Sequence, residues 1–410
     1  MKRYVLREYE EKHLSKDALT FKTGEELWKK YQGCIDVQFP SPKTANEWLL
    51  KPGGWVGCIP LTEDIILEVQ PKVPLNKLFA LLEIAYGLSG LRVKMFDSVI
   101  DIQRLDAFFD RIAKILASQV LLRSKRGFHR SYIDKKDALL FIKGRMCIKD
   151  LIKRKWDPRT VCKYQEHTSD IEDNRLLAWT LYRILRSGFC SSYNLPLIRR
   201  AYRTALAASS LQEYSGNDCL GRVYSRLNDD YQRYHNLCRF FLDSIGPNLA
   251  EGSGAMVPFL IEMPYVFEMC VANWIGNFIS DSPDYADLEI VTHYKDTRRG
   301  VMGSYSYDID ILLRRNGSPY MVIDTKYKNP EGPDSGDVQQ VVTYADLTGS
   351  DEAVLVYPAD LRSPLDIHIG DVRVRSMTFD LAKQLDISGR ELISRLLSRD
   401  VFVKSSALQA

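Results

Sequence analysis

The sequence predicts a multidomain α/β chain with a β-rich N-terminal domain, a helical middle region and a C-terminal domain of alternating helices and strands. At 410 residues, the chain is longer than one ordinary hydrophobic core supports. Short β-favouring runs dominate its beginning, apolar side chains then repeat at helical spacing, and the two patterns alternate towards its end. We therefore expect domains at residues 1–75, 76–247 and 248–410.

The N-terminal domain is predicted from two apolar runs that favour strands. They extend from Trp55 to Leu61 and from Ile65 to Lys72, and Gly53 and Gly54 supply a turn before the first. Strands in this range indicate a β-rich N-terminal domain.

The middle region is predicted to be helical because apolar residues recur three or four positions apart. Two such series are Leu78, Leu81, Leu82, Ala85 and Leu105, Phe108, Ile112, Leu116. A further helix is expected from about Asn174 to Gly188, and the preceding residues would cap and order it. The glycine-rich stretch 248–254 is the expected linker to the last domain.

A basic segment lies within the middle region. Between Arg123 and Lys163 there are 14 Lys and Arg residues against 4 Asp and Glu residues, although the whole chain carries a net charge of only +3. Four aromatic residues are interleaved with these charges: Phe128, Tyr132, Phe141 and Trp156. Such a segment could contact a phosphate backbone, or it could form a solvated helical face with ordinary core aromatics. The sequence leaves both interpretations open.

Several classes of protein are disfavoured by the composition. No apolar run approaches the roughly 20 residues that cross a membrane, and the N-terminus lacks the apolar core of a signal peptide. The eight cysteines are scattered without a C-x-x-C pair, and no H-E-x-x-H motif is present. We expect a cytoplasmic protein with reduced thiols, no membrane association and no zinc-hydrolase site.

The C-terminal domain contains the residues that indicate chemistry. Strands are expected at Ile309–Arg315 and Tyr320–Lys326, and the Asn-Gly pair between them is typical of a tight hairpin turn. The positions of Asp310 and Asp324 average to 317, inside the turn, so the hairpin should bring the two carboxylates close together. A register shift or a bulge could be needed to place both on one face.

These carboxylates, with a nearby lysine, predict a magnesium-dependent site. Lys326 lies two residues after Asp324 and therefore points to the same side of the strand. Mg²⁺ prefers carboxylate oxygens, and Lys326 could position a water nucleophile or stabilise the developing anion. Glu268, the single acid of a helix expected at 265–280, could complete the metal shell beside Asp310 and Asp324. Asp308 competes with Asp310 as the first ligand, but Asp310 directly precedes an apolar strand.

The acid-x-Lys pattern alone is weak, because it also occurs at Asp134–Lys136 and Glu10–Lys12. Only at position 324 does an apolar strand lead into it, and a buried acid there needs a counter-charge or a metal. The alternative is a structural ion pair between Asp324 and Lys326.

The residues after the hairpin strengthen the catalytic interpretation. Asp337, Gln340 and Tyr344 would share one face of a helix at 335–347, which precedes a strand at 352–357. This order of elements resembles the core of the PD-(D/E)xK nuclease fold, and residues 340–344 resemble the Q-x-x-x-Y element of its RecB-like branch. An isoleucine stands before Asp310 where that family has proline. The resemblance gives Gln340 and Tyr344 a role in positioning or in DNA contact.

A more specific resemblance covers most of the chain. Five segments resemble segments that occur in the same order in McrC, the family of endonuclease subunits of McrBC modification-dependent restriction systems. They are 67–72, 143–146, 166–177, 266–268 and 323–328. The resemblance implies a partner, the McrB-like AAA+ GTPase ring, which recognises modified DNA and translocates it. It also implies that the N-terminal part of this chain docks into the ring and stimulates GTP hydrolysis. No P-loop motif is present, so GTP should bind to the partner and not to this chain.

The expected function is therefore Mg²⁺-dependent hydrolysis of double-stranded DNA within a complex driven by a GTPase. Two alternatives remain. The chain could be a non-catalytic adaptor that only stimulates the ring, or a stand-alone nuclease of the same fold.

Overall fold

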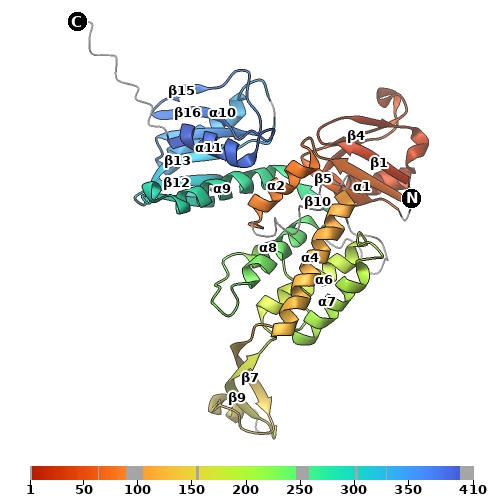
Figure 1. Ribbon diagram of the computed structural model, residues 1–410, viewed down its shortest axis with the longest axis vertical. Helices are drawn as coiled ribbons and strands as arrows, with labels where there is room; N and C mark the ends of the chain where they lie inside the picture. The colour runs from red at the N-terminus through yellow and green to blue at the C-terminus, as the bar shows by residue number, and fades with distance from the viewer. Residues whose placement is uncertain are drawn as a thin grey trace. The chain divides into compact units, whose positions relative to one another are not determined.

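The computed structural model describes residues 2–62, 64–88, 105–153, 157–245, 258–300, 303–328 and 330–397 (Figure 1). Its contacts divide the chain into two compact units. The first consists of Met1–Tyr4, Gly57–Glu68 and Ile102–Leu260, and the second of Val5–Val56, Val69–Asp101 and Ile261–Ala410. Each unit thus combines separate stretches, whereas the predicted domains follow the chain order, and the domain limits stay a prediction. No helix within the described ranges is long and apolar enough to cross a membrane.

The N-terminal residues form strands that belong to two sheets. A four-stranded sheet has the order β1-β6-β5-β10, with β1 at Lys2–Arg7, β6 at Ile65–Gln70, β5 at Trp55–Pro60 and β10 at Phe259–Glu262. A three-stranded sheet has the order β2-β4-β3, at Lys12–Leu14, Trp48–Pro52 and Ile35–Gln38. Helix α1 (Phe21–Tyr31) begins after Thr20, whose side chain accepts a hydrogen bond from Thr23 N at 3.1 Å. The two apolar runs predicted as strands thus correspond to β5 and β6.

The described part of the first unit contains four long helices, labelled in Figure 1. They are α4 (Leu105–Arg126), α6 (Glu172–Ser187), α7 (Leu195–Ala208) and α8 (Tyr231–Ser244). The residues that predicted α4 by their spacing are all buried. Helix α6 ends at Gly188, which adopts a left-handed φ of 74°. The predicted linker at 248–254 lies outside the described residues.

The middle region is not helical throughout, which corrects part of the prediction. Strands β7 (Ser131–Leu139), β9 (Thr160–Thr168) and β8 (Arg145–Met146) form a small sheet, and the short helix α5 (Ile148–Lys153) lies between β8 and β9 in the chain. The sequence pattern does not predict these strands, because charged residues interrupt their apolar ones. Within the first unit, this sheet lies at the end away from β10 (Figure 1).

A six-stranded mixed sheet dominates the second unit. Its order is β11-β12-β13-β14-β16-β15, at Leu288–Gly300, Gly303–Arg315, Ser318–Thr325, Glu352–Tyr357, Val372–Thr378 and Asp366–Ile369. β13, β14 and β16 are parallel, and the other neighbours are antiparallel. Consecutive residues of β12 and β13 are buried, because side chains on both faces of the sheet are covered.

The second unit also contains helices, some of which pack on this sheet. They include α2 (Leu75–Ala85), α9 (Met263–Asp281), α10 (Ser335–Thr348) and α11 (Leu385–Leu397). Val341 and Ala345 of α10 pack in one core cluster with Leu312 and Val322 of the sheet. The predictions of a helix at 265–280, a helix at 335–347 and a strand at 352–357 are confirmed within three residues at each end.

Candidate active site

The β12–β13 hairpin brings two acidic residues together on adjacent strands. Ile311 pairs with Ile323, so the same register places Asp310 opposite Asp324. The predicted turn residues, Asn316 and Gly317, have φ values of 51° and 80°, as a tight hairpin turn requires. The register shifts only between Leu313 and Arg314, away from the two acids.

Asp310 is anchored by the residue that follows Asp324. The backbone N–H of Thr325 donates to Asp310 Oδ2 at 2.8 Å, and its hydroxyl donates to the same oxygen at 3.1 Å. Asp308 lies two residues earlier, is half exposed and pairs with Lys295 at 3.2 Å. The contacts of Asp310 therefore make it the more direct neighbour of Asp324.

Asp324 forms an ion pair with Lys326. Asp324 is only 2% exposed, and its Oδ2 lies 2.7 Å from Lys326 Nζ. That oxygen accepts no hydrogen bond of good geometry, although the ammonium lies this close to it. The contact is therefore mainly coulombic, and a buried carboxylate oxygen is left without a directed donor.

Lys326 also contacts helix α10. Lys326 Nζ donates to Gln340 Oε1 at 2.9 Å, and Gln340 Nε2 donates to the Tyr344 hydroxyl at 2.8 Å. Gln340 and Tyr344 lie one turn apart on α10, so a single helical face orients the ammonium. The six predicted site residues are thus connected through contacts or charge, while their roles stay a prediction.

A second group of residues lies next to Lys326. Asp337 is buried at the start of α10, and its carboxylate lies 2.6 Å from Lys328 Nζ and 3.8 Å from Lys326 Nζ. Lys328 also pairs with Asp334, the residue that caps the helix. The Tyr357 hydroxyl donates to Asp337 Oδ2 at 3.3 Å. This arrangement ties the end of β13 to the start of α10.

Glu268 reaches the site from helix α9. Its Oε1 lies 3.2 Å from Nδ1 of His293, whose ring stacks on Tyr265 with 5.9 Å between ring centroids. The β11–β12 register puts His293 opposite Asp310, and its φ of 49° is left-handed. Sequence reasoning missed His293 because its nearness depends on a strand pairing rather than on a short motif.

The acids of this cluster are destabilised as anions. Burial, together with the negative charge of Asp310, raises the pKa of Glu268 to about 8. The same two causes raise the pKa of Asp324 to about 7, and burial raises the pKa of Asp310. Burial alone would lower the pKa of Lys326, but the charges of Asp324, Asp337 and Asp310 together outweigh it and raise that pKa. The cluster is therefore a place where an added cation would be favourable.

The donor atoms suit a hard cation only in part. Carboxylate oxygens are the ligands that Mg²⁺ prefers, and Asp324 Oδ2 accepts no hydrogen bond of good geometry that would satisfy it. Within the described ranges, no three side chains of His, Cys, Asp or Glu are grouped closely enough to hold a metal. Since Mg²⁺ often uses only one or two carboxylates and keeps several waters, Asp310 and Asp324 fit such a site. Glu268 fits less directly, as a partner through water.

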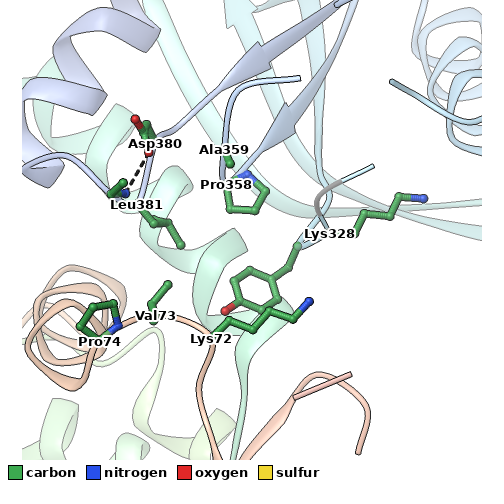
Figure 2. A pocket seen from close by; sticks show the side chains of 10 residues that line it. Lys72, Val73, Pro74, Lys328, Pro358, Ala359, Asp380 and Leu381 are labelled. Atoms are coloured by element: carbon green, nitrogen blue, oxygen red, sulfur yellow. Dashed lines mark hydrogen bonds between the residues drawn. The ribbon is translucent and has the colours of Figure 1, made fainter. Parts of the chain in front are cut away.

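A pocket of about 230 Å³ is lined by Tyr327 and Lys328, which follow Lys326 in the chain, and by residues of three other segments (Figure 2). Figure 2 shows Val73, Pro74 and Leu381 on one side, and Pro358 with Lys328 on the other. None of Asp310, Asp324 and Lys326 lines it. The pocket is therefore separate from the acidic cluster.

The fold is similar to that of known proteins. One is a chain of the refined half-complex from a tetradecameric assembly of Thermococcus gammatolerans McrB AAA+ hexamers with bound McrC. The two chains are 14% identical, with a TM-score of 0.52 over 97% of this chain and 100% of the other. A chain of the cryo-EM structure of the Thermococcus gammatolerans McrBC complex is 16% identical, with a TM-score of 0.43 over 67% of this chain and 87% of the other.

No curated protein matches the sequence. Residues 50–358 match the family described as McrBC 5-methylcytosine restriction system component. That match covers most of the 410 residues. The protein therefore belongs to the family of McrBC 5-methylcytosine restriction system components.

Proposed function

We propose that this chain is the DNA endonuclease subunit of a McrBC-like, modification-dependent restriction complex. One observation carries the proposal. Asp310 and Asp324 face each other on adjacent strands, and Lys326 Nζ lies 2.7 Å from Asp324 on the same strand. Two carboxylates with a lysine beside them are suited to hydrolysis of a phosphodiester with a hard metal ion.

The order of elements supports the same proposal. An antiparallel hairpin, β12–β13, is followed by α10 and by β14, which is parallel to β13. Helix α9 precedes the hairpin and α10 packs on the sheet, an arrangement that resembles the PD-(D/E)xK nuclease core.

The side chains divide the work between binding and charge stabilisation. Asp310 and Asp324 would hold Mg²⁺, with Glu268 as a partner through water. When bound, the ion would supply a Lewis acid that neutralises phosphate charge and activates water. Lys326, held by Asp324 and Gln340, would orient the attacking water or stabilise the developing anion. Tyr344 would support Gln340 in this task.

The proposed partners are double-stranded DNA and a McrB-like AAA+ GTPase. The sequence lacks a P-loop, so GTP hydrolysis would take place on another polypeptide. The similar Thermococcus gammatolerans assembly contains McrB AAA+ hexamers with bound McrC, and we propose that this chain corresponds to the McrC component.

The small β7-β9-β8 sheet is a better docking surface for that ring than the range 1–75. In the connection between β7 and β8, Leu140, Phe141 and Ile142 are 79%, 64% and 64% exposed, and Ile148 at the start of α5 is 65% exposed. Clustered, exposed apolar side chains of this size are typical of protein interaction surfaces. Basic residues of the same sheet, such as Lys135, pair with acids within it, which weakens the alternative of DNA contact.

A non-catalytic adaptor is the second candidate. It is favoured by the lack of a ready group of three metal-binding side chains among the described residues. In that case Asp324 and Lys326 would form only a structural ion pair. A stand-alone nuclease is the third candidate, and it would cleave without nucleotide.

Plasmid cleavage in Mg²⁺ tests these candidates. Methylated and unmethylated plasmids are incubated with the purified chain, with and without a McrB-like partner and GTP. We expect cleavage of methylated DNA only with partner and GTP, and at least about a hundredfold loss in Asp324→Ala. Equal cleavage by Asp324→Ala would contradict the site. GTPase stimulation without cleavage under any condition would favour the adaptor.

A further inference from the structure

Helix α7 carries an arginine-lined groove outside the candidate active site. The groove has a volume of about 630 Å³ and is lined by Pro196, Arg199, Arg200, Arg203, Thr204 and Ala207. All six residues belong to α7, and the opposite side of the helix is buried through Ile198, Ala201 and Ala205. The arginines therefore occupy the helix's solvent face.

The charge of this face is not balanced by nearby acids. Helix α7 contains no Asp or Glu, and the described part of the chain provides no ion pair for the three arginines. Elsewhere in the same unit, arginines are paired: Arg123 with Asp230 at 3.2 Å, and Arg175 with Asp170 at 2.7 Å. Asp110 of α4 reaches the start of α7, but its carboxylate already accepts hydrogen bonds from Ser191 and Asn194.

The composition of the groove favours a polyanion over a protein. Its members besides arginine are small, and it lacks the large apolar or aromatic anchors on which protein interfaces depend. Guanidinium groups bind phosphate through paired hydrogen bonds, and such contacts are independent of base sequence. We infer that the α7 groove binds the phosphate backbone of double-stranded DNA, an inference that rests on the proposed function.

Anisotropy of a short fluorescent DNA duplex tests the inference. The test variant is Arg199→Gln, Arg200→Gln and Arg203→Gln, since glutamine keeps the helix propensity of arginine. The matched control removes the same charge from α1 through Lys22→Gln, Lys29→Gln and Lys30→Gln. Both sets are made in Asp324→Ala, so that DNA is not cleaved during the measurement. Circular dichroism checks that each variant is folded.

We expect the arginine variant to bind DNA about tenfold more weakly, and the slope of log K against log salt to fall in magnitude by about 2 to 3. The α1 control should change the Kd by less than about twofold, because Lys29 and Lys30 are already paired with Glu25 and Glu26 of the same helix. Equal effects of the two variants would overturn the inference, because net charge alone would then account for the loss.

Two further outcomes distinguish DNA binding by α7 from protein binding and from catalysis. If DNA binding is unchanged but stimulation of the partner GTPase is lost, α7 binds a protein and the inference is wrong. The arginine variant could lose DNA binding while the chain with native Asp324 cleaves no DNA under any condition. In that case the DNA contact stands and the nuclease assignment fails. DNA binding and cleavage are thus read separately.

Discussion

Asp324 is a buried carboxylate whose charge destabilises the folded chain. Its pKa rises from an ordinary value of 3.8 to about 7 through burial and the nearby Asp310. The folded state therefore binds this proton more tightly than the unfolded state, and stability is lost as the pH rises from about 4 to 7. A bound cation would neutralise this charge and remove its cost. A cation-binding site can therefore tolerate the instability in the free protein.

We predict that Asp324→Asn abolishes cleavage but stabilises the chain in the absence of divalent ions. Asparagine resembles the protonated acid, so its advantage in unfolding free energy should grow by about 2 to 3 kcal/mol between pH 5 and pH 8. Denaturant unfolding of both proteins in EDTA measures this difference. A constant difference across that range would contradict the raised pKa of Asp324.

His235 shows the same linkage with the opposite sign. The ring is fully buried on α8; its Nδ1 lies 2.9 Å from the Tyr224 hydroxyl and its Nε2 lies 3.1 Å from the Asp173 carbonyl oxygen. Burial lowers its pKa from 6.5 to about 4. The neutral ring can satisfy both contacts by donating from Nε2 and accepting at Nδ1.

We predict that the contribution of His235 to stability is lost as the pH falls from about 6.5 to 4. Between these pH values His235 binds a proton in the unfolded chain, whereas its buried ring stays neutral in the folded chain. The difference in unfolding free energy between the native chain and His235→Gln should shrink by about 2 kcal/mol from pH 7 to pH 5. Comparing the two proteins cancels other titrating groups, such as Glu8. A pH-independent difference would show that His235 titrates normally.

At the scale of elements, β5 approaches β10 so closely that only glycine fits at position 57. Gly57 has a φ of 150°, and a Cβ atom there would lie 2.0 Å from the Phe259 carbonyl oxygen. Backbone cannot move aside as a flexible side chain can.

We predict that Gly57→Ala destabilises the chain by about 3 kcal/mol or more. Gly53→Ala is the matched control, because its nearest neighbouring atom would be 3.5 Å away, an ordinary contact. That variant should stay within about 1 kcal/mol of the native chain. Thermal unfolding distinguishes the two, and similar midpoints would mean that β5 and β10 can separate without loss.

The elements that the sequence predicts well are those with local signals. The Asn316–Gly317 turn, the apolar strand before Asp324 and the helical face of α10 are each encoded within a few residues. Strands β7 and β9 have no such local signal. Each is stabilised by pairing with the other, and charged residues hide the alternation of their side chains. Local patterns do not report such pairings.

The candidate site divides in the same way. Asp310, Asp324 and Lys326 could be predicted because one hairpin brings them together. His293 and Lys328 could not, because their positions depend on the β11–β12 register and on the loop that enters α10. The closeness of Glu268 to Asp310 likewise depends on how α9 packs, which sequence spacing does not determine.

At the scale of the whole molecule, two surfaces compete as the docking site for the proposed GTPase ring. The range 1–75 was expected from resemblance, and α1 presents Phe21 and Trp28, which are 68% and 44% exposed. The connection from β7 to β8 presents Phe141 and Ile142, both 64% exposed, directly after the exposed Leu140. Since binding energy concentrates in large apolar side chains, the denser group should dominate.

We predict that Phe141→Ser with Ile142→Ser abolishes complex formation with a McrB-like GTPase and its stimulation. Both side chains are 64% exposed and lie outside the buried core, so the free chain should keep its thermal stability and its DNA binding. The matched control, Phe21→Ser with Trp28→Ser, should leave both complex formation and stimulation unchanged. Size-exclusion chromatography and GTP hydrolysis measure the two effects. If only the α1 variant fails to bind, the docking surface lies in the N-terminal range, and the apolar residues of the small sheet must be covered by another partner.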